Sequence, residues 1–422
     1  MSLAMTCLRY APRPLSLLAA ITLLTACPGS DGDDAGDGAE DTEDTEDTGE
    51  AQVCVDPGSE LLANAKPARV PLPGASVFTC TNGWGTDAPQ KDSKWTRQVG
   101  EAIGEFGFAP VALAAHPDGG VVVAANAVFA RYDADGEPIW EAEQATTMQS
   151  QTYVVAEPAG TIVLATYDWN TDDIDVVRYD ANGTEIGPIA IPWNSPYPNI
   201  WGLRTFGQDL VIGGFDEDAS GSYEQTLLRL DPAGEVVLRK STNQANGQVL
   251  AVNDAGTAVF GSFPGFLVSL DNGAVLGNLS PSAGGPNMIV GAGDDFYMAG
   301  NAAGDLTVGR YAGSGSEQWL QTYDRATVND QGRAIAAGGG EIVVVGMTNL
   351  LDSSNSYWFG TQPIVIGVDA DGNAVWSDRI SAHGDASAVA IGSAGEVYVA
   401  GIAESDGPTT DQPSLLQWLR RY

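Results

Sequence analysis

Short apolar runs broken by turn residues follow one another along most of the chain, and one unit of this pattern returns seven times. Each unit has an apolar run, an alternating run, a third run that mostly ends in Asp, and a last short run. The second run is the clearest, as in Gly-Glu-Val-Tyr-Val-Ala-Gly at 395–401. Runs of this length and composition predict β-strands. The seven copies lie at 119–125, 160–166, 208–214, 256–262, 294–300, 340–346 and 395–401.

The third run of most units leads into a turn such as Asp133-Ala-Asp-Gly or Asp369-Ala-Asp-Gly. Asp bonds its own backbone in such turns and Gly accepts a positive φ, so these turns predict hairpins. Successive turns are 40 to 57 residues apart, which is enough for four short strands and their connections. Units of this kind, stacked radially, predict an all-β fold, a β-propeller with four-stranded blades.

The two ends of the repeat region complement each other. The seventh unit reaches Tyr422 within its third strand, whereas Lys94–Val99 forms an isolated fourth strand ahead of the first unit. This segment is similar to the fourth strands that contain Trp140, Trp319 and Trp376. We therefore predict that the N- and C-terminal strands pair to close the last blade. The predicted number of blades is seven, with six and eight as the alternatives.

Composition adds a strong charge imbalance to this picture. The chain has 55 acidic and 19 basic residues, for a net charge of −36. Such a surface repels nucleic acid and anionic lipid, so we expect neither as a partner. It favours solubility, basic partners or cations.

The first residues have the features of an export signal. A basic region with Arg9 and Arg13 precedes the apolar run 15–24, which is too short to span a bilayer. Leu24-Thr-Ala-Cys27 resembles the bacterial lipobox, and this resemblance implies cleavage before Cys27 and lipidation of that residue. An ordinary soluble secretory signal is the alternative. We expect a protein of the bacterial cell envelope, with the membrane leaflet left open.

The sequence predicts four regions. They are a lipoprotein signal peptide (1–26), an acidic disordered tether (27–52), an N-terminal extension (53–93) and the propeller (94–422). The tether is almost entirely Gly, Asp, Glu, Thr and Ala, a composition that cannot bury apolar area. Cys54 and Cys80 are an even pair in an oxidising compartment, so we predict a disulfide between them. A reactive or metal-binding role is the alternative.

The repeat region resembles two groups of propellers. The unit 112–136 is similar to bacterial SBBP-like repeats, which implies a secreted or surface propeller but no particular reaction. Asp133…Gly136…Trp140 and Asp369…Gly372…Trp376 are similar to the docking signature of PQQ-like propellers. Here the turn is one residue shorter and only some blades have the Trp. We therefore predict no quinone cofactor.

Catalytic and metal-binding patterns are weak in this sequence. The two histidines, His116 and His383, occupy non-equivalent positions in different units, which argues against a catalytic triad or a histidine metal site. The Asp-x-Asp-Gly turns lack the spacing and distal Glu of a calcium loop, so we predict no metal site and leave calcium on the acidic face as an alternative. The recurring arginines are expected to pair with neighbouring acids or cap strand edges; they are Arg131, Arg178, Arg229 and Arg310.

Function is expected where the repeat is interrupted. The insertions fall in connections that open on one propeller face, and aromatic residues beside acids there suit contact with protein, peptide or glycan. The insertions are 167–173, 192–201, 215–223, 348–363 and 403–413. The candidate binding residues are Trp169, Trp193, Tyr197, Trp201, Tyr223, Tyr357 and Trp358. The alternative is that these aromatics only pack the long loops.

These observations predict a monomeric, lipid-anchored binding or scaffolding protein, with no catalytic residue assigned. One alternative is a propeller enzyme, either a carboxylate-based hydrolase or lyase or a quinone-dependent dehydrogenase. Another is a factor in envelope structure or barrel assembly. The sequence does not identify the ligand.

Overall fold

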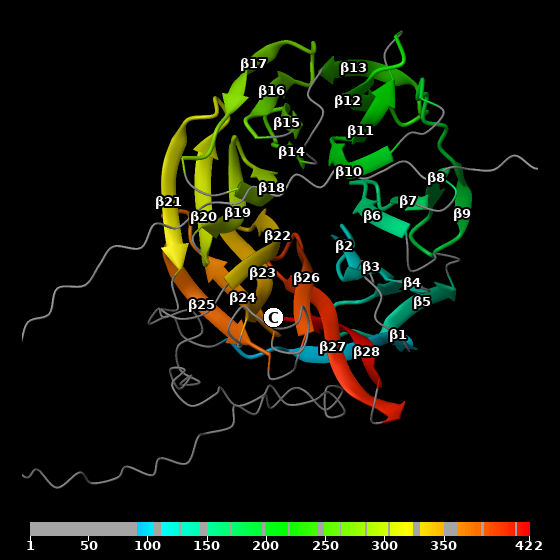
Figure 1. Cartoon of the computed structure of the whole chain (residues 1–422). Helices are drawn as coiled ribbons and strands as arrows, with labels where there is room; N and C mark the ends of the chain where they lie inside the picture. The colour runs from blue at the N-terminus through cyan, green and yellow to red at the C-terminus, as the bar shows by residue number, and fades with distance from the viewer. Residues whose placement is uncertain are drawn as a thin grey trace, which may run out of the picture. The chain divides into compact units, whose positions relative to one another are not determined.

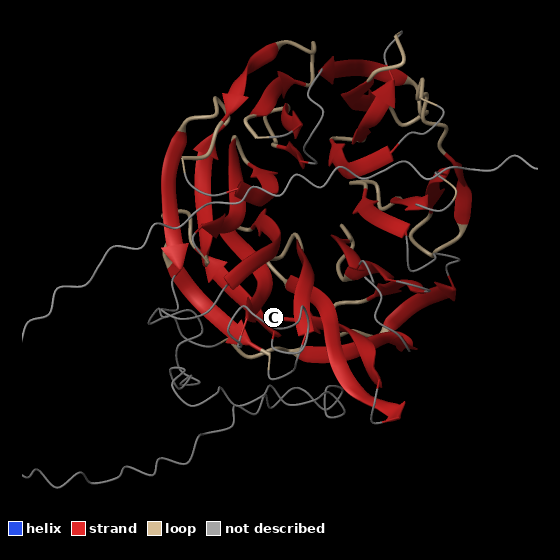
Figure 2. Cartoon of the chain, viewed as in Figure 1, coloured by secondary structure: helices blue, strands red, loops and turns tan. Residues whose placement is uncertain are grey.

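The computed structural model describes residues 91–422 apart from 104–110, 126–127, 144–149, 169–170, 172, 196–198, 218–219, 243–248, 262, 283–284, 303, 324–329, 350–360, 381–383 and 410–411. The described residues form strands joined by turns and loops (Figure 2), and they include no helix that could span a membrane. The signal peptide, tether, Cys27, Cys54 and Cys80 lie outside the described residues.

The strands form seven four-stranded antiparallel sheets, which confirms the predicted β-propeller (Figure 1). Blade 1 comprises β2 (Val111–Ala115), β3 (Val121–Ala125), β4 (Val128–Tyr132) and β5 (Pro138–Glu143). Blade 2 comprises β6 (Ser150–Ala156), β7 (Ile162–Asp168), β8 (Asp173–Tyr179) and β9 (Glu185–Pro188). Blade 3 comprises β10 (Asn199–Phe206), β11 (Asp209–Glu217), β12 (Tyr223–Leu230) and β13 (Val236–Thr242). Blade 4 comprises β14 (Val249–Val252), β15 (Thr257–Gly261), β16 (Gly265–Ser269) and β17 (Val275–Leu279).

Blade 5 comprises β18 (Gly285–Ala292), β19 (Asp295–Ala302), β20 (Asp305–Ala312) and β21 (Glu317–Tyr323). Blade 6 comprises β22 (Asp330–Gly338), β23 (Glu341–Asn349), β24 (Thr361–Val368) and β25 (Ala374–Arg379). Blade 7 comprises β26 (Gly384–Ile391), β27 (Val397–Thr409), β28 (Gln412–Arg421) and β1 (Trp95–Ile103). The first strand of each blade lies nearest the centre of the ring (Figure 1).

The N-terminal strand closes the ring as predicted. Strand β1 pairs antiparallel with β28, with Trp95 opposite Arg421 and Val99 opposite Gln417. The pairing completes blade 7 in the order β1-β28-β27-β26. It also covers an edge of β28 that would otherwise expose unpaired backbone groups.

The Asp turns between third and fourth strands also serve as docking points for the preceding blade. In the turn at Asp133, the carboxylate accepts the backbone N–H groups of Asp135 and Glu137, and Gly136 has a φ of 79°. The indole of Trp95, on β1, donates to the carbonyl of Ala134 in that turn. A Cβ on Gly136 would lie 2.8 Å from the same indole, so the glycine leaves room for the ring. The turn therefore closes the hairpin and also receives the neighbouring blade.

The same docking recurs around the ring. Trp140 of blade 1 donates to Ala181 in the turn of blade 2, and Trp319 of blade 5 donates to Ala370 in the turn of blade 6. Third-strand arginines reach the same turns. Their acceptors are the carbonyls of Ala181 for Arg131, Pro232 for Arg178, Leu270 for Arg229 and Ala370 for Arg310.

Three of these arginines also pair with acids of their own blades, which confirms the prediction for them. The pairs are Arg178 with Glu157, Arg229 with Asp209 and Arg310 with Asp295. Arg131 instead caps the turn of blade 2.

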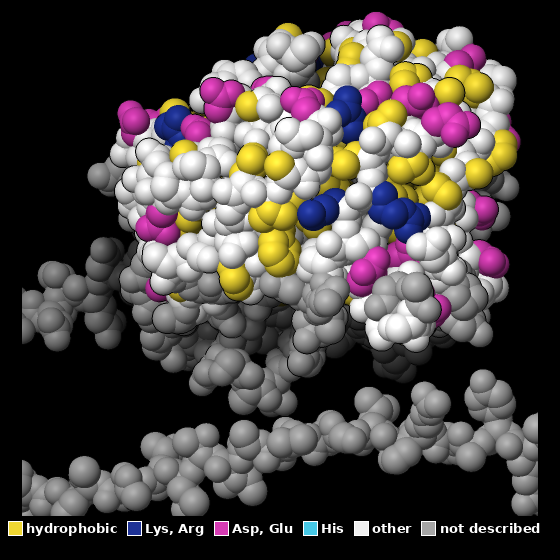
Figure 3. Space-filling model, turned by 90° about the horizontal axis from the view of Figure 1, so that it is seen from above, with side chains coloured by type: hydrophobic (Ala, Val, Ile, Leu, Met, Phe, Trp, Pro, Cys, Tyr) yellow, Lys and Arg dark blue, Asp and Glu magenta, His cyan; other side chains and the backbone are white. Residues whose placement is uncertain are grey.

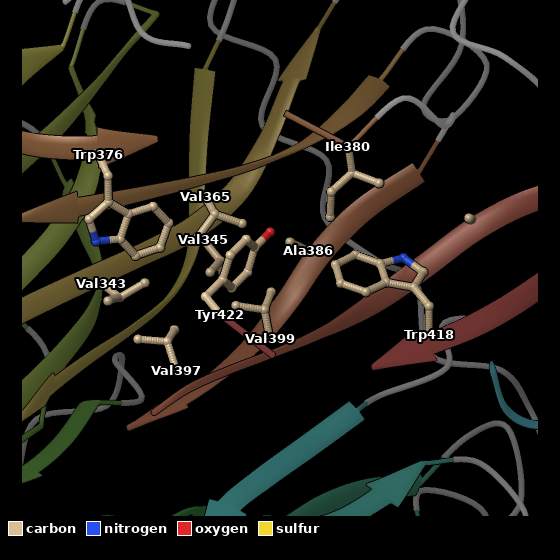
Figure 4. Close-up of a cluster of buried hydrophobic side chains, with 11 residues drawn as sticks. Val343, Val345, Val365, Trp376, Ile380, Ala386, Val397, Val399, Trp418 and Tyr422 are labelled. Atoms are coloured by element: carbon tan, nitrogen blue, oxygen red, sulfur yellow. The ribbon is translucent and has the colours of Figure 1, made fainter. Parts of the chain in front are cut away.

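Apolar clusters fill the space between neighbouring blades. Between blades 6 and 7, Tyr422 lies among valines of both blades and next to Trp376, with ring centroids 5.3 Å apart (Figure 4). Lys91 also contacts Trp376, with its Nζ 4.3 Å from the centroid of the Trp376 ring. Residues near both ends of the described chain thus pack where blade 7 meets blade 6.

A buried ionic network joins blade 6 to the closing strands. Arg420 Nη1 lies 2.7 Å from the carboxylate of Asp378, and Arg420 Nε donates to the hydroxyl of Thr96. The hydroxyl of Tyr422 donates to the same carboxylate at 2.5 Å. Burial, together with the Asp378 charge, raises the pKa of Tyr422 well above its ordinary value. Because strands from both ends of the chain contact Asp378 through this network, it stabilises the closed ring.

The outer edge of the ring exposes apolar side chains. Figure 3 looks onto one part of this edge, where hydrophobic side chains lie beside Lys and Arg side chains and between acidic ones. The exposed large apolar residues of the fourth strands are Ile139, Ile186, Val236, Val237, Val275, Leu276 and Val375.

Candidate functional site

The connections between second and third strands, and those between successive blades, open on the same face of a propeller because neighbouring strands run antiparallel. We call this the loop face. Asn194 and Ser195, from the connection between blades 2 and 3, and Tyr223, at the start of β12, lie on it. The predicted insertion at 403–413 continues the ladder of β27 and β28, with Thr409 opposite Gln412. In Figure 1 this hairpin projects beyond the ring.

The candidate aromatic residues have different environments. Tyr223 is 53% exposed, Trp193 is half-buried, and Trp201 is 4% exposed. Trp201 packs against Gly213 and Phe215, so its ring belongs to the blade core rather than to the rim of the loop face. Trp169, Tyr197, Tyr357 and Trp358 lie outside the described residues. The binding role of all seven stays a prediction.

A buried carboxylate fixes the connection that contains Trp193. Asp216, at the end of β11, is fully buried and accepts the backbone N–H groups of Asn194 at 2.6 Å and Ser195 at 2.8 Å. Arg239 of β13 donates to the same carboxylate at 2.5 Å and also to the carbonyl of Pro192. A buried charge is stable only when paired and hydrogen-bonded in this way. Asp216 does not stand out in the sequence, because single acids carry little information in so acidic a chain.

Trp193 packs tightly within this arrangement. A Cβ on Gly214 would lie 2.7 Å from its ring, so the indole lies directly over the backbone of β11. Its indole N–H is buried and has no acceptor among the described residues. Asp216 and Gly214 therefore hold the segment 192–195 in one conformation at the loop face.

The first strands of the seven blades surround an axial channel with a cavity of about 640 Å³. Four of these strands have a β-bulge, and in three of them the bulged residue lines the cavity: Trp201 in β10, Arg333 in β22 and Ser387 in β26. The fourth bulge lies at Asn287 in β18. Bulges commonly redirect side chains beside functional sites. The four bulges occupy equivalent positions and form what we call the bulge ring.

Glycine explains which strands are bulged. The second strands opposite the four bulges end their repeat with Gly214, Gly300, Gly346 and Gly401. A Cβ on Gly346 would lie 1.9 Å from the carbonyl oxygen of Gln331, and one on Gly401 would lie 2.0 Å from that of Asp385. Where the repeat ends in Ala125 or Thr166, the pairing is regular. Removal of the side chain at this position thus makes room for the bulge.

Charged groups lie at two levels of the channel. Arg333 donates to the sulfur of Met347 at 3.7 Å, and its Nε is buried with no acceptor among the described residues. Asp385 is buried, with 6% of its surface exposed. Burial raises the pKa of Asp385 to about 6, while the positive charge of Arg333 and a hydrogen bond from the backbone of Ile402 lower it. Arg204 donates to the carbonyl of Leu203, and burial lowers the pKa of the Arg204 guanidinium.

The histidine that the structure describes has a structural environment. His116 is buried, with Nε2 3.0 Å from the carbonyl of Gly160 in the next blade, and Nδ1 accepts the backbone N–H of Asp118. Burial is the largest influence on the pKa of His116 and lowers it. His383 lies outside the described residues. Among residues 91–422 that are described, no three His, Cys, Asp or Glu side chains form a metal-binding group.

Comparison with known proteins supports the fold alone. No protein-family model matches this sequence, and no curated protein matches it either. A chain in the crystal structure of the mitotic checkpoint complex is similar in structure, with a TM-score of 0.52 and 14% sequence identity. The match covers 83% of this chain and 99% of that chain. The similarity to SBBP-like and PQQ-like repeats stays a prediction from the sequence.

Proposed function

We propose that this protein is a lipid-anchored, extracytoplasmic binding or scaffolding protein that holds a protein, peptide or glycan at the loop face. The observation that carries the proposal is the Asp216 network, in which a fully buried carboxylate, paired with the partly exposed Arg239, fixes a surface connection. Burial of a carboxylate is costly, and here it positions a loop with a large aromatic residue. A recognition surface gains affinity when it is ordered before its partner arrives.

The structural neighbour from the mitotic checkpoint complex is a component of a protein assembly. It agrees with a scaffold role, since a propeller of this size can present its loops to another protein. The anchor of the present proposal rests on the lipobox at Leu24–Cys27. A Cys27→Ser variant should leave the detergent phase in a phase-partition assay. Retention of that variant in the detergent phase would argue against lipidation.

Affinity capture with the full-length protein tests the loop face. A Trp193→Ala variant should lose the captured partner, because the indole is the main apolar group held by the Asp216 network. Trp319→Ala is the matched control, since this indole docks blade 5 onto blade 6 away from that connection. Equal loss in both variants, or in neither, would contradict the proposal. Turnover of a glycan or peptide that a single acid-to-amide change abolishes would instead support the enzyme alternative.

A further inference from the structure

The lining of the axial cavity is unusual for this chain. The chain has 55 acidic residues against 19 basic ones, yet the charged residues that line the cavity are Arg204 and Arg333. Asp385 lies close enough to Arg333 for the charges to interact, but it does not line the cavity. The described part of the channel is therefore positively charged inside a strongly acidic protein.

Neither arginine pairs with a carboxylate of the described residues, unlike most of the other described arginines. The cross-blade arginines each bind the carbonyl of a turn, and most also bind an acid within their own blade. Among the described residues, Arg204 and Arg333 have no carboxylate within ion-pair distance. A guanidinium has five N–H donors. Most donors of these two side chains have no acceptor within the described part of the chain, which favours an anionic ligand in the cavity.

The bulge directs Arg333 into the cavity. Arg333 is the extra residue between Gly332 and Ala334 in β22, at the position that Ser387 occupies in the neighbouring β26. Arg333 Nε and the hydroxyl of Ser387 are both buried without a hydrogen-bond partner among the described residues. These two groups come from adjacent first strands. Both residues line the same cavity.

The rest of the cavity determines the other part of the ligand. Most of the other residues around the cavity are of apolar type and include Leu113, Phe263, Met288 and Ile335. The volume of about 640 Å³ lies within the range of small-molecule sites. Trp201 and Arg333 are the bulged residues of their strands and lie at the same level of the channel. Arg204 follows Trp201 by three residues, so it lies roughly 10 Å from that level along the strand direction, at about 3.3 Å per residue. The site therefore suits a molecule with a carboxylate at one end and an apolar body.

We propose that the bulge ring binds a small organic acid with an apolar body, whose carboxylate lies on Arg333 and Ser387 while its body packs against the apolar lining of the channel. This site lies inside the ring and does not depend on a partner at the loop face. Failure of the capture experiment would leave it standing, and its own failure would leave the loop-face proposal standing.

Calorimetric titration of the purified full-length protein tests the site with three probes. Benzoate has the carboxylate and an apolar body, benzyl alcohol has the body without the charge, and inorganic phosphate has charge without the body. We expect benzoate to bind more tightly than either of the other two by about tenfold, the value of one or two charge-assisted hydrogen bonds. Equal binding of benzyl alcohol would exclude a role for charge. Equal binding of phosphate would exclude a role for the apolar body.

Arg333→Gln should weaken benzoate binding by about tenfold or more. Arg97→Gln is the control, because Arg97 lies on the outer strand β1 and pairs with the exposed Glu137, away from the cavity. Measurement of thermal unfolding shows whether both variants fold. If Arg333→Gln fails to fold, Ser387→Ala is the second variant. It removes one hydroxyl, so it should weaken benzoate binding without preventing folding. Benzoate affinity that is unchanged in whichever variant folds would overturn the proposal.

Discussion

The effect of a buried charged residue in this propeller depends on the groups around it. Asp385 shows this most clearly, because its carboxylate is buried beside Arg333 without forming a close ion pair with it. Loss of solvation therefore outweighs the favourable charge, and the net result is a pKa of about 6 against an ordinary value of 3.8. Asp216 has the opposite arrangement, with an arginine and several N–H donors around a carboxylate of similar burial. Hydrogen bonds and an ion pair therefore offset the cost of burial at Asp216, whereas at Asp385 that cost is only partly offset.

The raised pKa of Asp385 predicts a pH dependence. Between about pH 4 and pH 6 the folded protein binds this proton more tightly than the unfolded chain, so this contribution to stability falls as the pH rises and is constant above that range. The rise in pKa corresponds to roughly 3 kcal/mol at most. Asp385→Asn removes the charge and should stabilise the protein at pH 8 by up to this amount. It should have little effect at pH 4.

Chemical denaturation at the two pH values measures this difference. Asp371→Asn is the control, because Asp371 is exposed on the turn of blade 6. A variant at Asp385 that is less stable than the unmodified protein at pH 8 would show that attraction to Arg333 exceeds the cost of burial.

At the scale of strands, the sequence was sufficient for the blades and insufficient for the bulges. The period of the second strand predicts the ring because it recurs in every blade, and the Asp-x-x-Gly turns and the fourth-strand tryptophans support it where they occur. Arg333, Ser387 and Asp385 occur once each in their units, so nothing distinguishes them from ordinary variation. The glycine that ends the second-strand repeat in four blades is a usable signal in retrospect. It reports the bulge opposite, as Gly346 does for Arg333.

The aromatic candidate Trp201 also lies in a place that the sequence alone does not predict. Trp201 belongs to the segment 192–201 that interrupts the repeat, which predicts a rim position. The structure places it at a bulge of the first strand, where it packs on Gly213 of the second strand. The sequence shows where the repeat is interrupted but not where the next strand begins. A residue at that boundary can therefore lie in the core instead of on the surface.

The bulge in β22 depends on the missing side chain at Gly346. Gly346→Ala should force the carbonyl of Gln331 to move and cost about 1–3 kcal/mol, as overpacking does. It should also redirect Arg333 and weaken benzoate binding. Gly338→Ala, on β22 itself, is the control, because its Cβ would contact only Ile391, at 3.2 Å. Thermal unfolding and titration of both variants give the comparison. Equal stability and equal benzoate affinity in the two variants would contradict this role of Gly346.

At the scale of the whole propeller, the ring is closed by side chains as well as by the β1–β28 ladder. Asp378 of blade 6 binds Arg420 and Tyr422, and Arg420 in turn binds Thr96 of β1. Removal of one partner from a buried ion pair leaves the other charge unpaired, which costs about 3–5 kcal/mol. Closure of the ring should therefore be the step most sensitive to this network.

Asp378→Ala should lower stability by that amount and raise the rate of amide hydrogen exchange in β1 more than in the inner strands. Asp295→Ala provides the comparison, because the pair of Asp295 with Arg310 is partly exposed and lies within blade 5. A partly exposed pair contributes little. Exchange in β1 that is unchanged by Asp378→Ala would show that the backbone ladder alone closes the ring.

Site-specific photo-cross-linking shows which face of the ring meets a partner, and we expect it to be the loop face. A photoreactive amino acid replaces Tyr223, which is 53% exposed at the loop face, or Asp135, which is exposed on the opposite face. Both full-length proteins are irradiated in intact cells. We predict a discrete cross-linked partner from position 223 and none from position 135. Cross-links from position 135 with none from position 223 would contradict the account.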